Sequence, residues 1–167
     1  YSMAVQTIML VAVYFGTKEI NWGSGSNAKM GLIISILLIQ LIAIPGAILL
    51  SKVSKIKGNL FALKLSIFIW ILLCFSAFLV YDPIHFYFIA GFVGLVMGGT
   101  QSLSRSTFSK YIPKATKDTS SFFSFFDISE KLGIVIGMFS YGFIEQITGS
   151  MRNSIVALVV FFLIGLL

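Results

Sequence analysis

Apolar and polar stretches alternate along the whole chain, and the apolar stretches have the lengths of membrane helices. Four inner segments come close to or exceed the roughly 20 residues that cross about 30 Å of hydrocarbon. The first and last segments are shorter, and we expect them to be truncated because the chain is a fragment of a larger membrane protein. The six apolar segments cover residues 3–15, 30–50, 60–81, 85–103, 121–147 and 155–167.

A membrane β-barrel is the structural alternative, and the pattern argues against it. Barrel strands alternate apolar and polar residues over about ten positions. Residues 33–39 and 67–75 are instead almost continuously apolar. The sequence therefore predicts an all-α integral membrane protein with six transmembrane helices.

Composition supports the membrane prediction. The chain of 167 residues is 57% hydrophobic and 11% charged, with a mean hydropathy of +0.99. Soluble domains are nearer half apolar and about a quarter charged, because water must wet their surface. Seventeen Phe, three Pro and one Cys exclude a disordered chain and a disulfide scaffold.

The net charge of +6 indicates membrane orientation rather than nucleic-acid binding. Most of the basic residues lie in the gaps at 51–59 and 104–120, which alternation puts on one side of the membrane. These residues are Lys52, Lys55, Lys57, Arg105, Lys110, Lys114 and Lys117. The other side holds Lys18, Lys29 and Arg152. The positive-inside rule places the more basic side in the cytoplasm.

Three charged residues, Asp127, Glu130 and Lys131, interrupt the fifth apolar segment. A charge at the bilayer centre costs about 2.5–3.5 kcal/mol on insertion scales, so these groups must be paired or must face protein or water. Asp127 and Lys131 have the i, i+4 spacing of an ion pair within one helix. In one interpretation the cluster only locks neighbouring helices together, and Arg105 pairs with Asp127 or Glu130. In the other, which we favour, a carboxylate titrates beside a water-filled path.

The remaining polar and glycine positions carry weaker signals. Gly94 and Gly98 form a small-xxx-small pair, which favours close helix packing. Gln6 and Gln101 are candidate solute contacts, although hydrogen bonds to other helices are the explanation that such residues favour, because buried polar groups find partners in any case. With one His and one Cys, no spacing predicts a metal site, and nothing predicts a cofactor or a catalytic nucleophile.

Two stretches carry a family resemblance. The sequence from Gly98 to Pro113 (GGTQSLSRSTFSKYIP) and that from Ser121 to Gly133 (SFFSFFDISEKLG) resemble late helices of one branch of the major facilitator superfamily. This branch contains the vacuolar-effluxer-like proteins of the autophagy-related type and their bacterial relatives, the "unknown major facilitator" permeases. Residues 6–7 and 144–149 are similar to the same branch.

The resemblance implies that residues 1–167 are the C-terminal half, helices seven to twelve, of a twelve-helix transporter. Such a half consists of two inverted three-helix repeats. The first, second, fourth and fifth segments would border a central cavity shared with an N-terminal six-helix half. Fungal members are associated with the release of amino acids from the vacuole, and the compact loops favour a bacterial inner (plasma) membrane for this chain.

One turn departs from the superfamily. Members often have a Gly-xxx-Asp-xx-Gly pattern between the second and third helices of each half, whereas this chain has Ser51, Lys55 and Gly58. No acidic residue is available there for a gating ion pair, which the missing half would carry instead. Lys55 and Arg105 are the candidate residues of a cytoplasmic gate.

The main hypothesis is a secondary transporter that moves a small polar solute, such as an amino acid, by alternating access. Asp127 and Glu130 are the candidates for proton coupling, and Lys131 would tune them. The alternative is a membrane protein with a structural or receptor role that keeps the fold without transport, in which the charged cluster is fully paired and dry. A membrane-embedded enzyme is the weakest alternative, because no nucleophile or metal set accompanies the carboxylates.

Overall fold

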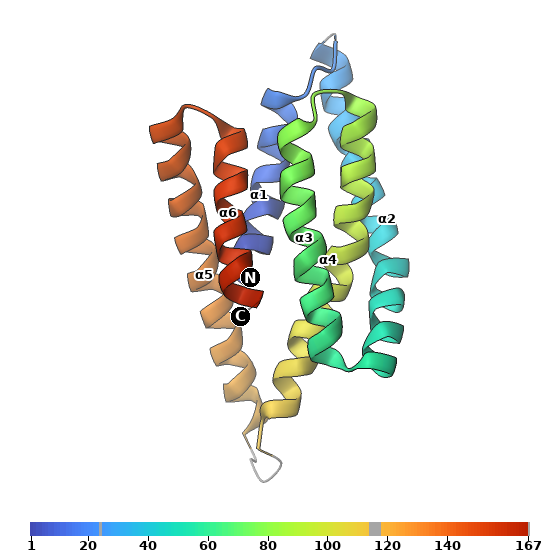
Figure 1. Ribbon diagram of the computed structural model, residues 1–167, viewed down its shortest axis with the longest axis vertical. Helices are drawn as coiled ribbons and strands as arrows, with labels where there is room; N and C mark the ends of the chain where they lie inside the picture. Colours follow the sequence, from blue (N-terminus) through green and yellow to red (C-terminus); the bar gives the residue numbers. More distant parts are fainter. Residues whose placement is uncertain (24, 114–117, 167) are drawn as a thin grey trace.

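The chain folds into an elongated bundle of helices that run alternately up and down (Figure 1). The structure, a computed structural model, describes residues 1–23, 25–113 and 118–166. These residues contain six helices and no strand, so the all-α prediction is confirmed. The helices are α1 (Ser2–Glu19), α2 (Gly25–Lys57), α3 (Asn59–Leu79), α4 (Pro83–Tyr111), α5 (Thr119–Thr148) and α6 (Met151–Leu166).

α2 and α4 extend furthest beyond the hydrophobic segments that predicted them. α2 continues through Pro45 to Lys57, and α4 continues through Arg105 to Tyr111. The expectation of a polar connection from residue 104 is therefore wrong as far as residue 111. Arg and Lys are good helix formers, and hydropathy indicates where hydrocarbon ends rather than where a helix ends. Lys114 and Lys117 lie outside the described residues.

By length and composition, three of the described helices are apolar enough to cross a bilayer on their own: α2 from Ala28, α3 and α4. α6 is a shorter apolar helix. In α5 the hydropathy is reduced by four charged residues, Asp127, Glu130, Lys131 and Glu145. Large apolar side chains are exposed on all six helices, as expected where lipid or further protein replaces water as the surroundings.

Basic residues gather at one end of the bundle. The α2–α3 and α4–α5 connections lie at this end (Figure 1). Lys52, Lys55 and Lys57 close α2 there, and Lys110 lies in the last turn of α4. We call this end the basic end, and the end with the other three connections the opposite end. Within the described residues, the clustering of basic side chains agrees with the alternation that the sequence predicts.

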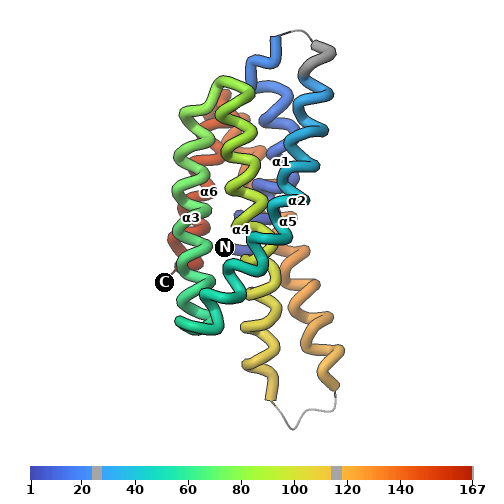
Figure 2. The backbone as a smooth tube through the Cα atoms, turned by 90° about the vertical axis from the view of Figure 1, so that its right-hand side faces the viewer, coloured from blue at the N-terminus to red at the C-terminus, as the bar shows by residue number. Residues whose placement is uncertain are grey.

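The helices form two groups of three. α2, α3 and α4 pack together, with the most extensive contact between α2 and α4. α1, α5 and α6 form the second group (Figures 1 and 2). The groups meet mainly where α3 packs against α6, whereas the α4 and α5 backbones hardly approach each other within the described ranges.

Glycines bring α2 and α4 into backbone contact. A Cβ atom at Gly94 would lie 2.5 Å from the Ile39 carbonyl oxygen, and one at Gly98 would lie 2.6 Å from that of Ala43. On the facing helix, a Cβ at Gly46 would collide with the Leu95 carbonyl. The close packing predicted from the Gly94–Gly98 spacing is confirmed.

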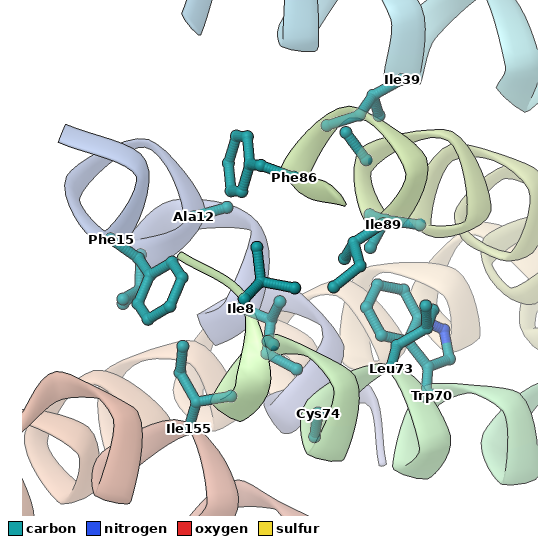
Figure 3. Close-up of a pocket in the computed structure, with 15 residues that line it drawn as sticks. Ile8, Ala12, Phe15, Ile39, Trp70, Leu73, Cys74, Phe86, Ile89 and Ile155 are labelled. Atoms are coloured by element: carbon teal, nitrogen blue, oxygen red, sulfur yellow. The ribbon is translucent and has the colours of Figure 1, made fainter. Parts of the chain in front are cut away.

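The contact between the groups is centred on Trp70 of α3, which is fully buried and stacks on Phe162 of α6 with ring centroids 5.9 Å apart. Its indole N–H donates to the Thr100 hydroxyl at 3.3 Å. Beside it lies an apolar cavity of about 60 Å³, which Ile8, Trp70, Cys74 and Ile89 help to line (Figure 3). A cavity with so few polar partners for water is expected to stay dry.

At the opposite end, a buried arginine joins three helices. Arg152, at the start of α6, is only 6% exposed. Its Nε donates to the Glu19 carboxylate at 2.7 Å, and its other nitrogens donate to the carbonyls of Glu19, Ala77 and Phe78 at 2.8–3.3 Å. The guanidinium also lies over the Tyr81 ring, 3.9 Å from its centroid. We call this cluster the Arg152 clasp.

Candidate functional site

A polar cavity of about 180 Å³ lies between the two helix groups. α1 contributes Gln6, and α4 contributes Gln101, Ser104 and Arg105. α5 contributes Phe126 and Glu130. These six residues line the cavity. Because Gln6 belongs to the first turns of α1, which begins about halfway along the bundle, the cavity lies near mid-height (Figure 1). Its volume is well above the ~10–15 Å³ that one water needs, and its walls offer water or a solute several polar partners.

Glu130 is the acidic group of this cavity. It is half-buried on α5, and its Oε1 accepts hydrogen bonds from two side chains of α1. The Ser2 hydroxyl donates at 3.0 Å and the Gln6 amide nitrogen at 3.2 Å. Both donors come from α1, because glycines on α5 let this helix approach closely: a Cβ at Gly137 would collide with the Thr7 hydroxyl, and one at Gly133 would touch Met3. The carboxylate is thus held by neutral donors, with no cation in the described part of the chain within ion-pair distance.

Asp127, one turn before Glu130, pairs with α4 instead. Its Oδ1 lies 2.6 Å from a terminal guanidinium nitrogen of Arg105. The guanidinium also lies 5.8 Å from the centroid of the Phe126 ring. Of the two pairings considered for Arg105, the structure has the one with Asp127. Both side chains are about half exposed, at 54% for Arg105 and 42% for Asp127.

The ion pair that the spacing of Asp127 and Lys131 permits is not formed in the part of the chain that the structure describes. Lys131 is exposed and makes no hydrogen bond or ion pair with any residue that the structure describes. The i, i+4 spacing permits such a pair, but Arg105 from α4 occupies the Asp127 carboxylate. The charged cluster of α5 is therefore divided, with its carboxylates toward α1 and α4 and its ammonium on the exposed side.

The structure brings together four of the residues that the sequence singled out: Gln6, Gln101, Arg105 and Glu130 all line the cavity. Lys55 does not join them. It is exposed in the last turn of α2 at the basic end and does not line the cavity. Two candidate residues of the cytoplasmic gate are therefore separated from each other.

Sequence reasoning missed several polar residues of the site. Ser2 donates to Glu130, and Ser104 lines the cavity and shares a hydrogen bond of 2.7 Å with the Tyr1 hydroxyl. Isolated hydroxyls at the ends of apolar runs are too common in membrane helices to stand out. A search of neighbouring helices for donors to the intramembrane carboxylate of Glu130 would have found Ser2. It would not have found Ser104, which bonds the Tyr1 hydroxyl instead.

The described residues hold no group of three or more His, Cys, Asp or Glu side chains placed to bind a metal ion. Cys74 is buried beside Trp70, away from the polar cavity. What the site offers chemically is one hydrogen-bonded carboxylate, one ion pair and two amides around a small polar space. Such an arrangement suits the binding of water or of a small polar group.

Comparison with known proteins gives this arrangement its context. The family described as "Vacuole effluxer Atg22 like" matches residues 1–167. An uncharacterized MFS-type transporter, YxiO of Bacillus subtilis, is 28% identical over 166 residues, which are 99% of this chain and 37% of the relative. Autophagy-related protein 22 of Yarrowia lipolytica is 29% identical over 163 residues, covering 95% of this chain and 27% of the relative. The same protein of Saccharomyces cerevisiae is 34% identical over 80 residues, which are 48% of this chain and 15% of the relative.

No solved structure matches this chain. The chain spans about a third of the length of the relatives that it matches from end to end. Because the family match covers every residue and YxiO is an MFS-type transporter by name, the expected resemblance is confirmed. The chain belongs to the vacuole effluxer Atg22-like family of major facilitator transporters, which is a family of membrane transporters and not of enzymes.

Proposed function

We propose that the protein to which this chain belongs is a secondary active transporter that moves a small polar solute across a membrane by alternating access. An amino acid or a similar metabolite is the solute class that we put forward, with protons as the coupling ion. Membership of a transporter family supports the first part. The second rests on the polar cavity and on the carboxylate in its wall.

Within that protein, we assign residues 1–167 to the C-terminal six-helix half, facing an N-terminal half across the central cavity. The packing of the helices supports this assignment. If α1–α3 and α4–α6 are inverted repeats, α1 is equivalent to α4, α2 to α5 and α3 to α6. The contact between α2 and α4 is then equivalent to the contact between α5 and α1, and the contact between α3 and α6 is its own equivalent. The α2–α4 and α1–α5 contacts each lie within one helix group, and the α3–α6 contact joins the two groups.

We place the basic end in the cytoplasm, because Lys and Arg concentrate on the cytoplasmic side of membrane proteins. A bacterial plasma membrane is the proposed location. It is supported by the match to YxiO of Bacillus subtilis along nearly the whole chain.

Glu130 is the proposed coupling residue, and the observation that carries the proposal is its setting. It lies in the wall of a polar cavity and accepts two hydrogen bonds from α1, with no cation as partner among the described residues. Ionisable groups inside membrane segments mark ion or substrate paths by default. A carboxylate held only by neutral donors can accept a proton without leaving a partner charge stranded.

The other candidates receive roles that follow from their contacts. Asp127 is tied to Arg105, so we assign this pair to gating at the cytoplasmic side rather than to proton binding. Gln6 and Gln101 are proposed solute contacts because their amides line the same cavity. Lys55 and Lys131 lie outside the cavity, and for them we retain only a contribution to the local positive charge.

The competing proposal is a non-transporting protein that keeps the fold. It requires a charged cluster that is fully paired and dry. The polar cavity and the exposed Lys131 speak against it.

The experiment is transport by the full-length protein in proteoliposomes loaded with a pH-sensitive dye. Pooled amino acids are added outside, and the internal pH is followed. The proposal expects a protein-dependent pH change that Glu130→Gln abolishes. Glu145→Gln is the matched control, since it neutralises another half-buried carboxylate of α5 that does not line the cavity. A pH change that persists unaltered in Glu130→Gln would refute the coupling role.

A further inference from the structure

The two helix groups are joined very differently at their two ends. At the opposite end, Arg152 makes four hydrogen bonds to α1 and α3, and it is almost completely buried. Towards the basic end, the chain itself connects α4 to α5, and the link between the facing parts of these helices that the structure describes is made by side chains. It consists of the exposed Arg105–Asp127 pair and of Phe108, whose ring lies 4.8 Å from that of Phe126 and 5.8 Å from that of Phe123.

The polar cavity lies on the dividing line between the groups. Gln6, Phe126 and Glu130 come from the group α1, α5 and α6, whereas Gln101, Ser104 and Arg105 come from the group α2, α3 and α4. Any change in the angle between the groups would therefore open or close this cavity.

The strengths of the two links decide which end can open. The clasp places a guanidinium on the last carbonyls of α3 and on a carboxylate, in a site from which surrounding groups exclude solvent. Breaking it would leave buried charge and carbonyl groups without partners, which is costly. The Arg105–Asp127 pair is half exposed, and exposed ion pairs contribute little because surroundings can replace either partner. The contacts of Phe108 are apolar, so its ring can shift against the neighbouring rings without breaking a hydrogen bond or an ion pair.

We infer that the two three-helix groups hinge at the Arg152 clasp and open at the Arg105–Asp127 pair, so that this half has its own gate between the polar cavity and the basic end. The inference builds on the gating role proposed for Arg105 and adds the hinge and the direction of opening. Arg152 acts as a positioning residue. It contacts none of the residues that line the polar cavity but fixes the C-terminal end of α1, and the N-terminal end of this helix carries Ser2 and Gln6. The apolar cavity beside Cys74 lies between the clasp and the polar cavity, and its empty volume allows a small rotation of one helix group against the other.

Accessibility of single thiols tests the hinge without any solute. The full-length protein, with its own cysteines replaced, carries either Gln101→Cys in the polar cavity or Ile20→Cys beside the clasp. Ile20 is 5% exposed and directly follows the last residue of α1. In detergent, where both ends can be reached, the rate of labelling by a charged maleimide is measured for each reporter. Asp127→Ala removes the Arg105–Asp127 pair, and Glu145→Gln serves as the matched control on α5.

The inference expects Asp127→Ala to raise the labelling rate at position 101 at least threefold and to leave that at position 20 unchanged. Arg152→Lys, or Glu19→Gln should that variant not fold, is expected to raise the rate at position 20, which establishes that this reporter can respond. A rise at both positions in Asp127→Ala, a rise at position 20 alone, or no rise at either would each overturn the hinge. Since labelling needs neither solute nor proton movement, a failure of the coupling role of Glu130 would leave this result untouched, and the reverse also holds.

Discussion

Arg152 at the start of α6 donates to the carboxylate of Glu19 at the end of α1, with Nε and Oε2 separated by 2.7 Å although the two residues are 133 positions apart in the sequence. The arginine is 6% exposed and also serves two carbonyls at the end of α3. One side chain thus satisfies groups at the ends of two other helices. The two helix groups are therefore joined more firmly at the opposite end of the bundle than at the basic end.

Removing this arginine should destabilise the protein strongly. Arg152→Ala leaves the Glu19 carboxylate without its cation and the α3 carbonyls without donors, and loss of one partner of a buried pair costs about 3–5 kcal/mol. Arg152→Lys should be intermediate, because an ammonium keeps the charge but lacks the planar fork. Thermal unfolding of the detergent-solubilised protein measures the effect, and Lys18→Met, an exposed cation in the last turn of α1, is the control. Equal midpoints for Arg152→Ala and Lys18→Met would contradict the clasp.

Glycine at position 46 should be indispensable for the α2–α4 contact. In Gly46→Ala the new Cβ collides with the Leu95 carbonyl, which is backbone and cannot turn aside. We expect a loss of about 1–3 kcal/mol of stability, as for overpacked cores. Gly142→Ala on α5 is the matched control, because nothing lies within 4 Å of its Cβ position and alanine is the better helix former. If both changes left the thermal midpoint unchanged or raised it, the close α2–α4 packing would be wrong.

Much of this architecture follows from the sequence, because it depends on local patterns. The six helices follow from apolar runs, and the α2–α4 contact follows from the spacing of Gly94 and Gly98. The extension of α4 to Tyr111 did not, because its last turns are polar and leave no apolar period to detect. Hydropathy along a chain reports the surroundings of a segment more directly than its backbone conformation.

The sequence could not predict which side chains on different helices pair with one another. Lys131 has the correct spacing from Asp127, yet Arg105 from another helix is the partner. The choice depends on how α4 and α5 are rotated, which many weak contacts decide together. For the same reason nothing in a lone Arg152, on the less basic side, indicated that it would be buried against Glu19.

The start of α5 should respond to acid through Asp118. This carboxylate caps the helix, accepting bonds from the Ser121 hydroxyl and backbone N–H and from the Ser120 hydroxyl, and these bonds lower its pKa below the ordinary 3.8. The ionised cap therefore stabilises the helix fully above pH 3.8, and the stabilisation is lost as the pH falls through the lowered pKa.

Asp118→Asn keeps an acceptor oxygen but removes the titration, so the thermal midpoint of this variant should fall less than that of the parent when the pH is lowered below 3.8. Asp118→Ala should lose stability at neutral pH as well, because it removes the cap. Midpoints measured at neutral and acidic pH check both expectations. An Asp118→Asn profile identical to that of the parent would show that the cap does not titrate in this way.

The polar cavity predicts that α1 and α5 act together in transport. Gln6→Leu removes a donor to Glu130 and a polar wall of the cavity at once, whereas Gln40→Leu changes an exposed amide of α2 that does not line it. Amino-acid uptake by the full-length protein should fall several-fold in Gln6→Leu and stay near the parent level in Gln40→Leu. Equal uptake in the two variants would remove Gln6 from the proposed solute path.

The central claim is that Glu130 couples proton movement to transport, and the most direct test is internal pH in proteoliposomes of the full-length protein when pooled amino acids are added. We expect a pH change in the parent and in Glu145→Gln, and none in Glu130→Gln. A pH change of the same size in Glu130→Gln would contradict it.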